Sequence, residues 1–142
     1  MIIKNESAII CRLLDSVKEI IDYACICDTG STDNTISVVK QYFEENNLNG
    51  CVITKEFVDF STNRNYALEE AKKHGDYVLL LDADMKLMNV DKFDKKDLDG
   101  RGFSLKQCGS KLVYYNLRLV PSNVYSKYVG VTHEYLSFSG KS

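Results

Sequence analysis

An unbroken apolar run that ends in two aspartates is the feature that most restricts the fold of this chain. The run is Tyr77-Val78-Leu79-Leu80-Leu81, and Asp82-Ala83-Asp84 follows at once. A short run without polar alternation is typical of a strand buried on both faces of a parallel sheet. In open α/β sheets, ligands bind just beyond the carboxyl ends of such strands. The sequence therefore predicts a ligand site at these two carboxylates.

The close spacing of the two carboxylates indicates either a cation or a turn. Like charges one residue apart are costly without a cation beside them. Hard divalent metals prefer oxygen ligands, and Mg²⁺ or Mn²⁺ is usually shared between a few carboxylates and substrate phosphates. A metal-bound nucleoside diphosphate is therefore one hypothesis for Asp82 and Asp84. The alternative is a simple turn, because aspartate is a common turn residue.

The composition is that of an ordinary globular domain. The 142 residues carry 18 basic and 20 acidic side chains, giving a formal net charge of −2. Without a basic excess, no nucleic-acid partner is expected. No apolar run approaches the roughly 18 residues of a transmembrane segment, and the N-terminus lacks the apolar stretch of a signal peptide. The five cysteines contain no C-x-x-C pair, which favours buried thiols in a reducing, cytoplasmic compartment.

Helical and strand-like patterns alternate along the first part of the chain. Helices are predicted over roughly residues 7–21, after residue 31 and from residue 61, and strands over residues 23–27, 51–54 and 77–81. This alternation favours a parallel sheet with helices on both faces. The pattern then changes to a charged loop at 89–100, an antiparallel hairpin formed by 103–106 and 113–120, and an extended stretch at 125–138.

The segment from Asp28 to Thr35 joins a predicted strand to a predicted helix. Gly30 permits a tight turn, and the free amide groups at the start of the helix attract an anion or order the loop. An ordinary capped turn explains Asp33. Such a cap does not need Asp28, so we expect Asp28 to accept a hydrogen bond from a nucleotide base or ribose.

Two further positions carry candidate chemistry. Arg64 is predicted in the first turn of a helix, where the helix dipole disfavours a cation. This position indicates a carboxylate or phosphate partner, since the planar guanidinium group suits both. The alternative is an exposed arginine without such a partner. His133 and Glu134 stand side by side near a strand end. There they are a candidate metal ligand and a candidate general base, and the alternative is a pair of solvated polar side chains.

Taken together, these motifs resemble the family 2 glycosyltransferases of the GT-A fold. Each motif alone is weak, but the ordered set is specific and covers nearly the whole chain. The similarity lies in five segments, which are Met1-Ile2-Ile3-Lys4-Asn5-Glu6, Asp28-Thr29-Gly30-Ser31-Thr32-Asp33, Asn63-Arg64-Asn65 with Ala67-Leu68, Leu81-Asp82-Ala83-Asp84-Met85 and Gly130-Val131-Thr132-His133-Glu134.

The resemblance implies an α/β, Rossmann-like three-layer GT-A fold. Its central sheet would be mostly parallel, with helices on both faces and a small antiparallel hairpin region near the C-terminus. It implies one domain over residues 1–142, with a nucleotide-sugar-binding half at 1–84 and a short acceptor-side half at 85–142. Family members usually have more residues before Lys4 and after Glu134, so we expect an incomplete first strand and an incomplete acceptor side.

The resemblance also implies the roles of individual residues. Glu134 would be the catalytic base, and Asp84, Asp82 and His133 would be the ligands of Mn²⁺ or Mg²⁺. The implied donor-binding residues are Asn5, Glu6, Asp28, Arg64, Asp82, Ala83 and Asp84.

The implied reaction is transfer of a sugar, by a single inverting displacement, from a nucleoside diphosphate donor to an acceptor hydroxyl. A UDP-sugar is the expected donor, the acceptor is a glycan, protein or lipid, and pairing with a second copy to complete the site is an open option. The alternative is a sugar-nucleotide-binding module that is inactive alone, or that needs a partner or a missing C-terminal half. A sugar-1-phosphate nucleotidyltransferase is disfavoured because Lys4-Asn5-Glu6 lacks the glycines of its phosphate loop.

Overall fold

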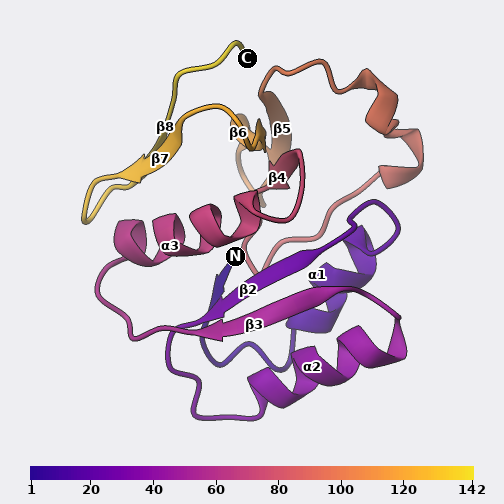
Figure 1. Ribbon diagram of the computed structural model, residues 1–142, viewed down its shortest axis with the longest axis vertical. Helices are drawn as coiled ribbons and strands as arrows, with labels where there is room; N and C mark the ends of the chain where they lie inside the picture. Colours follow the sequence, from indigo (N-terminus) through magenta and orange to yellow (C-terminus); the bar gives the residue numbers. More distant parts are fainter.

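The computed structural model describes residues 1–142 and contains a three-stranded parallel sheet (Figure 1). Its strands are β1 (Ile2–Ile3), β2 (Ala24–Asp28) and β3 (Gly50–Thr54), in the order β1-β2-β3. In the register, Ile2 is opposite Cys27 and Cys25 is opposite Cys51. All five residues of β2 are buried, as expected for the central strand of a sheet that is covered on both faces.

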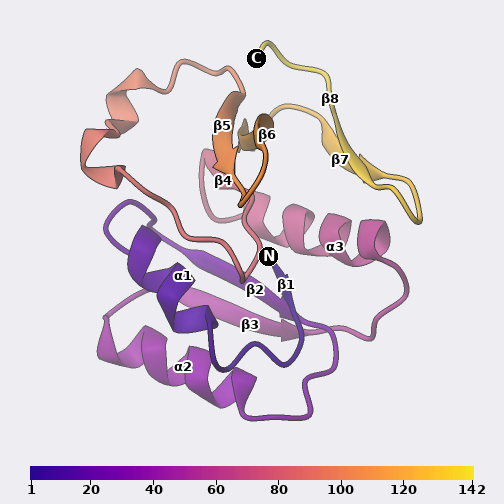
Figure 2. The ribbon, with the colours of Figure 1, turned by 180° about the vertical axis from the view of Figure 1, so that it is seen from behind.

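Helices cover both faces of this sheet, as the sequence predicted. The helices are α1 (Ile10–Val17), α2 (Thr35–Glu45) and α3 (Phe60–Lys72). In the view from behind, α1 and α2 lie together, and α3 lies between the parallel sheet and the hairpin formed by β7 (Ser126–Val129) and β8 (Tyr135–Phe138) (Figure 2). Successive side chains of β2 point to opposite faces of the sheet. Ile26 packs in the hydrophobic cluster that contains residues of α1 and α2. The thiol of Cys25 lies on the other face, 3.8 Å from the carbonyl oxygen of Ala67 in α3.

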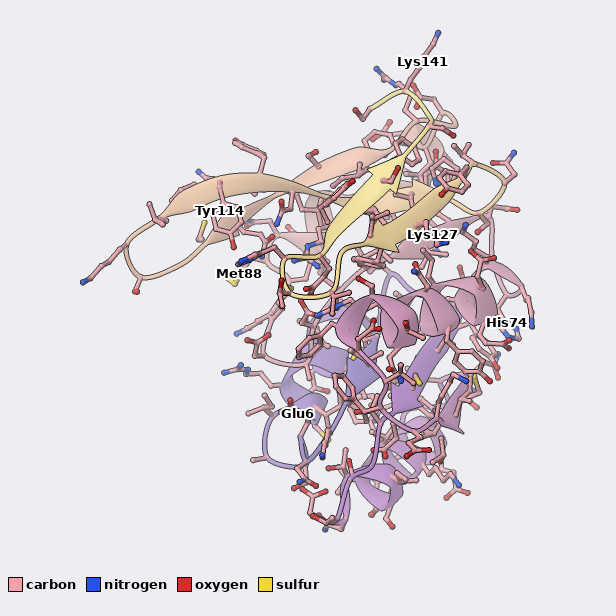
Figure 3. All side chains as sticks on the ribbon, turned by 90° about the vertical axis from the view of Figure 1, so that its left-hand side faces the viewer. Glu6, His74, Met88, Tyr114, Lys127 and Lys141 are labelled. Carbon is pink, nitrogen blue, oxygen red and sulfur yellow. The ribbon has the colours of Figure 1, made fainter.

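The second half of the chain forms antiparallel sheets. One contains β4 (Tyr77–Leu79), β5 (Phe103–Cys108) and β6 (Val113–Pro121), in the order β4-β6-β5. The other is a hairpin of β7 (Ser126–Val129) and β8 (Tyr135–Phe138). Two short 3₁₀ turns, η1 (Val90–Lys92) and η2 (Lys95–Asp97), occupy the predicted charged loop. The β5–β6 hairpin extends away from the body of the molecule, with Tyr114 near its end (Figure 3).

Two details of the prediction were wrong. The helix expected over residues 7–21 is regular only from Ile10 to Val17, with hydrogen-bonded turns on either side. The strand at Tyr77 pairs antiparallel with β6 and is not a member of the parallel sheet. Its unbroken apolar run has a physical explanation, because its side chains enter two different cores. The first core contains Leu81 and Ala83, and the second contains Val78 and Leu80 together with Val120 of β6.

An apolar cavity of about 730 Å³ lies between the parallel sheet and β4. Residues of β2, residues 77–81 and the inner side of α3 line it, and Arg64 and Tyr128 stand at its wall. None of the helices is both long enough and apolar enough to cross a membrane. All five cysteines are free thiols, but the prediction that they are buried is confirmed only for Cys25 and Cys27, because Cys11 and Cys51 are half-buried and Cys108 is exposed.

Candidate functional site

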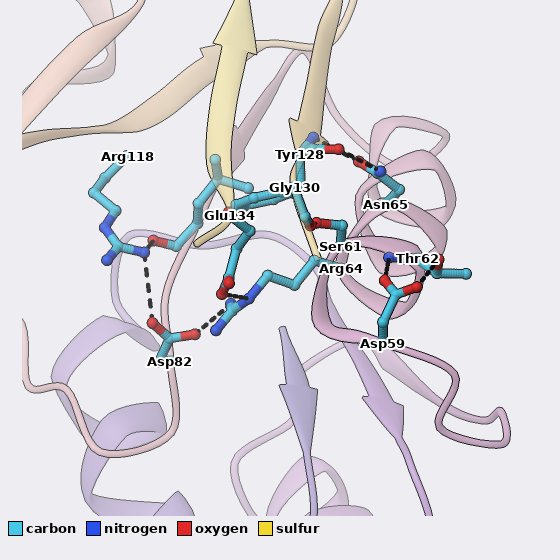
Figure 4. A network of polar contacts seen from close by, with 11 residues as sticks. Asp59, Ser61, Thr62, Arg64, Asn65, Asp82, Arg118, Tyr128, Gly130 and Glu134 are labelled. Carbon is cyan, nitrogen blue, oxygen red and sulfur yellow. Dashed lines mark hydrogen bonds and ion pairs between the residues drawn. The ribbon is translucent and has the colours of Figure 1, made fainter. Parts of the chain in front are cut away.

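Four charged side chains from four parts of the chain meet just beyond the end of β4 (Figure 4). Arg64 comes from α3, Asp82 follows β4, Arg118 comes from β6, and Glu134 directly precedes β8. Each side chain is largely buried, with exposed fractions of 18, 26, 14 and 22%, respectively. The structure thus brings together three residues that the sequence singled out, and adds Arg118.

The start of α3 fixes the position of Arg64. Asp59 caps the helix, because its carboxylate accepts hydrogen bonds from the Thr62 amide at 2.7 Å and from the Thr62 hydroxyl at 2.9 Å. The Asn63 side chain accepts from the Val58 amide at 2.9 Å and donates to the Glu56 carbonyl at 3.0 Å. The sequence predicted Arg64 in the first turn of this helix. Because the helix begins at Phe60, Arg64 is instead the first residue of the second turn.

Arg64 is the central cation of the site. Its Nη1 lies 2.5 Å from Asp82 Oδ1, its Nε lies 3.5 Å from Glu134 Oε1, and its guanidinium carbon lies 5.7 Å from the centre of the Tyr128 ring. Burial opposes the charge, but Asp82 and Glu134 outweigh burial, so the pKa of Arg64 lies above its usual value. Of the two readings of this arginine, the one with a carboxylate partner is therefore correct, and the exposed arginine is not. The buried Nε of Arg64 nevertheless has no hydrogen-bond acceptor.

Asp82 lies between two guanidinium groups. Oδ1 faces Arg64, and Oδ2 lies 3.6 Å from Arg118 Nη1. Arg118 is held only by long contacts, which are 3.4 Å to the Leu80 carbonyl oxygen and 3.2 and 3.4 Å to Gln107 Oε1. Sequence reasoning missed Arg118, because it occupies a polar position in an alternating strand. That pattern predicts a solvated side chain unless the partner strand is known.

The turn between β7 and β8 positions Glu134. Asn65 of α3 donates to the Tyr128 carbonyl at 2.8 Å and accepts from the Tyr128 amide at 2.7 Å, which attaches β7 to the helix. The Ser61 hydroxyl donates to the Gly130 carbonyl, one helical turn away from Asn65. Gly130 has a φ of +105°, and a Cβ atom there would lie 2.7 Å from the carbonyl oxygen of His133. Glycine is therefore required for the turn that presents Glu134 to Arg64.

Asp28 has a role that the sequence analysis did not expect. Its carboxylate, which is 1% exposed, accepts hydrogen bonds from the Gly30 and Ser31 amides at 2.9 Å each and from the Ser31 hydroxyl at 2.5 Å. The inference that the turn does not need Asp28 was therefore wrong. Asp33 has a structural role in the turn before α2, because its carboxylate accepts from the Thr35 amide at 2.9 Å and from the Thr35 hydroxyl, although the N-cap position itself is held by Asn34.

The first loop packs against the same turn. Asn5, with a φ of +52°, accepts the Thr32 amide at 2.8 Å through its side chain, and its own amide donates to the Ser31 hydroxyl at 2.9 Å. The Glu6 amide donates to the Thr35 hydroxyl at 2.9 Å. The structure therefore brings these residues to the Asp28 loop, at the carboxyl ends of β1 and β2, and their donor-binding role stays a prediction.

The predicted metal ligands do not form a protein-only metal site. No three His, Cys, Asp or Glu side chains are arranged to hold an ion, so Asp82, Asp84 and His133 do not converge. Asp84 is exposed, and its carboxylate makes no hydrogen bond or ion pair, whereas its carbonyl oxygen accepts from Arg12 at 3.0 Å. Ala83 is buried in the core. One free carboxylate fits an ion that is shared with a substrate, since Mg²⁺ is commonly bound by one or two carboxylates plus substrate phosphates.

Comparison with known proteins bears on the fold and the family of the chain. Among solved structures, the chain is similar to residues 1–349 of TarS from S. aureus, with a TM-score of 0.52 and 28% identity over 63% of this chain and 28% of that one. The GT-A type of α/β fold predicted from the sequence is confirmed.

The sequence profile described as Glycosyl transferase family 2 matches residues 1–100, and the chain belongs to this family. It is 34% identical over 87 residues to an uncharacterized glycosyltransferase of Rickettsia felis, covering 61% of this chain and 28% of that protein. The chain is also 37% identical over 87 residues to an uncharacterized glycosyltransferase of Rickettsia prowazekii, covering 61% of this chain and 27% of that protein. The match therefore spans less than a third of these relatives. Arg64, Asp82 and Asp84 lie inside the part that matches the family, and Arg118 and Glu134 lie beyond it.

Proposed function

We propose that this domain transfers a sugar from a nucleoside diphosphate sugar to an acceptor hydroxyl, with inversion at the anomeric carbon and with help from a divalent metal. A UDP-sugar is the first donor to test, and the acceptor is a glycan, protein or lipid. The five free thiols support a cytoplasmic location. Membership of the family supports the general reaction, and the arrangement of the charged side chains supports the mechanism.

The observation that carries this proposal is the link that Arg64 makes between two carboxylates. Asp82 follows β4, within the part that matches the family, and Glu134 precedes β8, in the later part of the chain. Arg64 contacts both of them from α3. A carboxylate suited to proton removal therefore stands beside the residues proposed to bind the donor, which is the arrangement that a single displacement requires.

Glu134 is the proposed base. Its carboxylate lies 3.5 Å from Arg64 and so has a fixed place beside the proposed donor site. As the acceptor hydroxyl gives its proton to Glu134, its oxygen forms a bond to the anomeric carbon on the face opposite the diphosphate. The bond from that carbon to the diphosphate oxygen breaks, and the diphosphate leaves with the electron pair. One displacement inverts the anomeric configuration, by the same geometry that separates inverting from retaining glycosidases.

The diphosphate leaves with negative charge that must be neutralised. Asp84 would hold a Mn²⁺ or Mg²⁺ ion through its free carboxylate, with Asp82 and His133 as further candidates, and the ion would supply Lewis-acid stabilisation of the leaving diphosphate. Arg64 would contribute a fixed positive charge, because its pKa is raised and it remains protonated at any working pH.

A sugar-nucleotide-binding module without its own transfer activity is the second candidate. The observation that favours it is that the match covers only 28% of the Rickettsia felis protein. Such a module would bind the donor but would need a partner, a second copy or further chain for the acceptor side.

The test is release of free nucleoside diphosphate from a panel of UDP- and GDP-sugars, with Mn²⁺ and with EDTA. Asp84→Ala is the variant, and Asp91→Ala, at another exposed aspartate, is the matched control. Metal-dependent release from one donor, lost only in Asp84→Ala, supports the transferase and identifies the donor. Metal-dependent donor binding without release supports the binding module. A chain that neither binds nor cleaves any donor contradicts both candidates.

A further inference from the structure

Arg118 differs from the other arginines of the molecule in how it is held. It is 86% shielded from solvent, yet none of its contacts is shorter than 3.2 Å. Arg64, by contrast, makes a contact of 2.5 Å to Asp82. A shielded guanidinium normally forms short, aligned bonds to an anion, because its five donors lose water on burial. Each guanidinium nitrogen of Arg118 donates instead to a neutral oxygen, and its nearest anion, Asp82 Oδ2, lies 3.6 Å away.

Arg64 has an unused hydrogen-bond donor. Its Nε atom is buried and has no hydrogen-bond acceptor, since Glu134 lies 3.5 Å away without the alignment of a hydrogen bond. An orphaned buried donor is costly, and its presence points to a missing acceptor. Arg64, with one free donor, and Arg118, without a close anion, thus stand on either side of the Asp82 carboxylate.

The charges of this group are unevenly placed. The four side chains carry two positive and two negative charges, but both carboxylates contact Arg64, Asp82 at 2.5 Å and Glu134 at 3.5 Å. Arg118 faces only Asp82, at 3.6 Å, and is the less compensated of the two cations. A diphosphate has several oxygens spread over two phosphorus centres, and the planar fork of arginine suits such an anion.

We propose that Arg118 is a second diphosphate-binding residue, which together with Arg64 forms a clamp that Asp82 occupies while no donor is bound. This inference rests on the proposed function and adds to it a residue from outside the part that matches the family. On donor binding, the diphosphate takes the place of the Asp82 carboxylate between the two guanidinium groups. Asp82 is thereby freed to turn toward the metal or the ribose.

The test measures binding of inorganic pyrophosphate by calorimetry, in EDTA and at low ionic strength. Pyrophosphate needs no nucleoside pocket, so the result does not depend on which base the donor carries. Arg118→Gln is expected to weaken binding by about tenfold or more, the range for loss of charge-assisted hydrogen bonds. Arg118→Lys keeps the positive charge but lacks the planar guanidinium. Its affinity for pyrophosphate is expected to lie between that of Arg118→Gln and that of the unaltered chain. Asp82→Asn is expected to bind pyrophosphate more tightly than the unaltered chain, because the internal competitor is gone.

Two control variants separate this role from a structural one. Arg101→Gln removes a positive charge from an exposed ion pair with Asp99 and is expected to leave pyrophosphate binding unchanged. Gln107→Met removes the side chain that contacts Arg118 but keeps the guanidinium, and is expected to retain most of the binding. Equal binding by Arg118→Gln and Arg101→Gln would overturn the proposal. So would a loss in Gln107→Met as large as that in Arg118→Gln, or a failure of the unaltered chain to bind pyrophosphate.

The donor panel distinguishes failure of this inference from failure of the proposed function. A chain that releases nucleoside diphosphate but binds pyrophosphate equally well without Arg118 overturns the clamp alone. A chain that neither binds nor cleaves any sugar nucleotide overturns the proposed function, and the clamp as a donor site with it.

Discussion

Arg64 and Glu134 face each other with Nε and Oε1 3.5 Å apart, although one lies on α3 and the other at the start of β8. The same guanidinium holds Asp82 at 2.5 Å. The contact therefore joins the part of the chain that matches the family to the part that does not. It gives Glu134 a fixed place beside the proposed donor site. A general base needs such a fixed place, because it must lie within hydrogen-bond reach of the proton that it removes.

The first prediction concerns Glu134 itself. Glu134→Gln is expected to lower the rate of sugar transfer by about 10²- to 10⁴-fold, the usual contribution of a general base. Donor affinity should change little, because the amide retains an oxygen facing Arg64. Single-turnover transfer with the donor found in the panel measures the rate, and calorimetry with that donor measures the affinity.

Glu69→Gln is the matched control for this prediction, since Glu69 is exposed and pairs only with Lys72. A transfer rate in Glu134→Gln equal to that of Glu69→Gln would remove Glu134 from the role of base.

The second prediction concerns the turn before Glu134. Gly130→Ala places a Cβ atom 2.7 Å from the His133 carbonyl oxygen at a φ of +105°, so the turn must change and Glu134 must move from Arg64. We expect a loss of about 1–3 kcal/mol in the free energy of unfolding and a fall in transfer rate similar to that of Glu134→Gln. Urea denaturation and single-turnover kinetics measure the two effects.

Gly100→Ala separates backbone strain from the clash, because Gly100 also has a positive φ, of +86°, but open space around its Cα. It is expected to lose some stability and to keep full transfer activity. If Gly130→Ala behaved in the same way, the turn would not be what positions Glu134.

The sequence predicted the layers of this fold because local signals define them. Apolar periodicity and helix-start residues such as Ser61 are local signals, and they predicted the helices and most of the strands. The partner of the strand at Tyr77 was not predictable in the same way. An apolar run reports burial on both faces, and Val78 is buried whether the neighbouring strand runs parallel or antiparallel. That neighbour, Val120, lies far along the chain, and no local pattern records it.

The site was partly predictable for the same reason. Arg64, Asp82 and Glu134 each stand where a local pattern is unusual, after a strand or near a helix start, and the structure brings them together. Arg118 stands in a regular alternation, so only the pairing of its strand with β4 reveals that it faces Asp82. Asp28 was misinterpreted because its hydrogen bonds depend on the conformation of its own loop, which the residue types alone do not specify.

The third prediction follows from this loop. Asp28→Ala leaves the Gly30 and Ser31 amides without their acceptor in a buried turn, so the free energy of unfolding should fall by about 1–3 kcal/mol without any ligand present. Asp22→Ala is the control, since the Asp22 side chain is 86% exposed and its ion pair with Lys95 contributes little. Urea denaturation compares the two variants. Equal stability would mean that the loop holds its shape without Asp28.

The fourth prediction concerns the pH dependence of stability. Hydrogen bonds from the Thr35 hydroxyl and amide and from the Ser7 hydroxyl hold the pKa of Asp33 below its ordinary value of 3.8. Between the lowered pKa of the folded state and the ordinary pKa of the unfolded state, the unfolded chain binds more protons. The stabilisation by Asp33 is therefore fully present above about pH 4 and is lost as the pH falls through this window.

Asp33→Asn removes the titrating group but keeps an oxygen that can accept the Thr35 amide. The stability difference between the unaltered chain and this variant should be largest at pH 6–7 and should shrink as the pH falls toward 3, because protonation then weakens the hydrogen bonds of Asp33. Urea midpoints at a series of pH values measure this difference in stability. The pH-dependent contributions of the other carboxylates cancel in the difference, because both proteins contain those carboxylates. A difference that stays constant from pH 7 to pH 3 would show that the Asp33 carboxylate does not depend on its charge to hold the Thr35 turn.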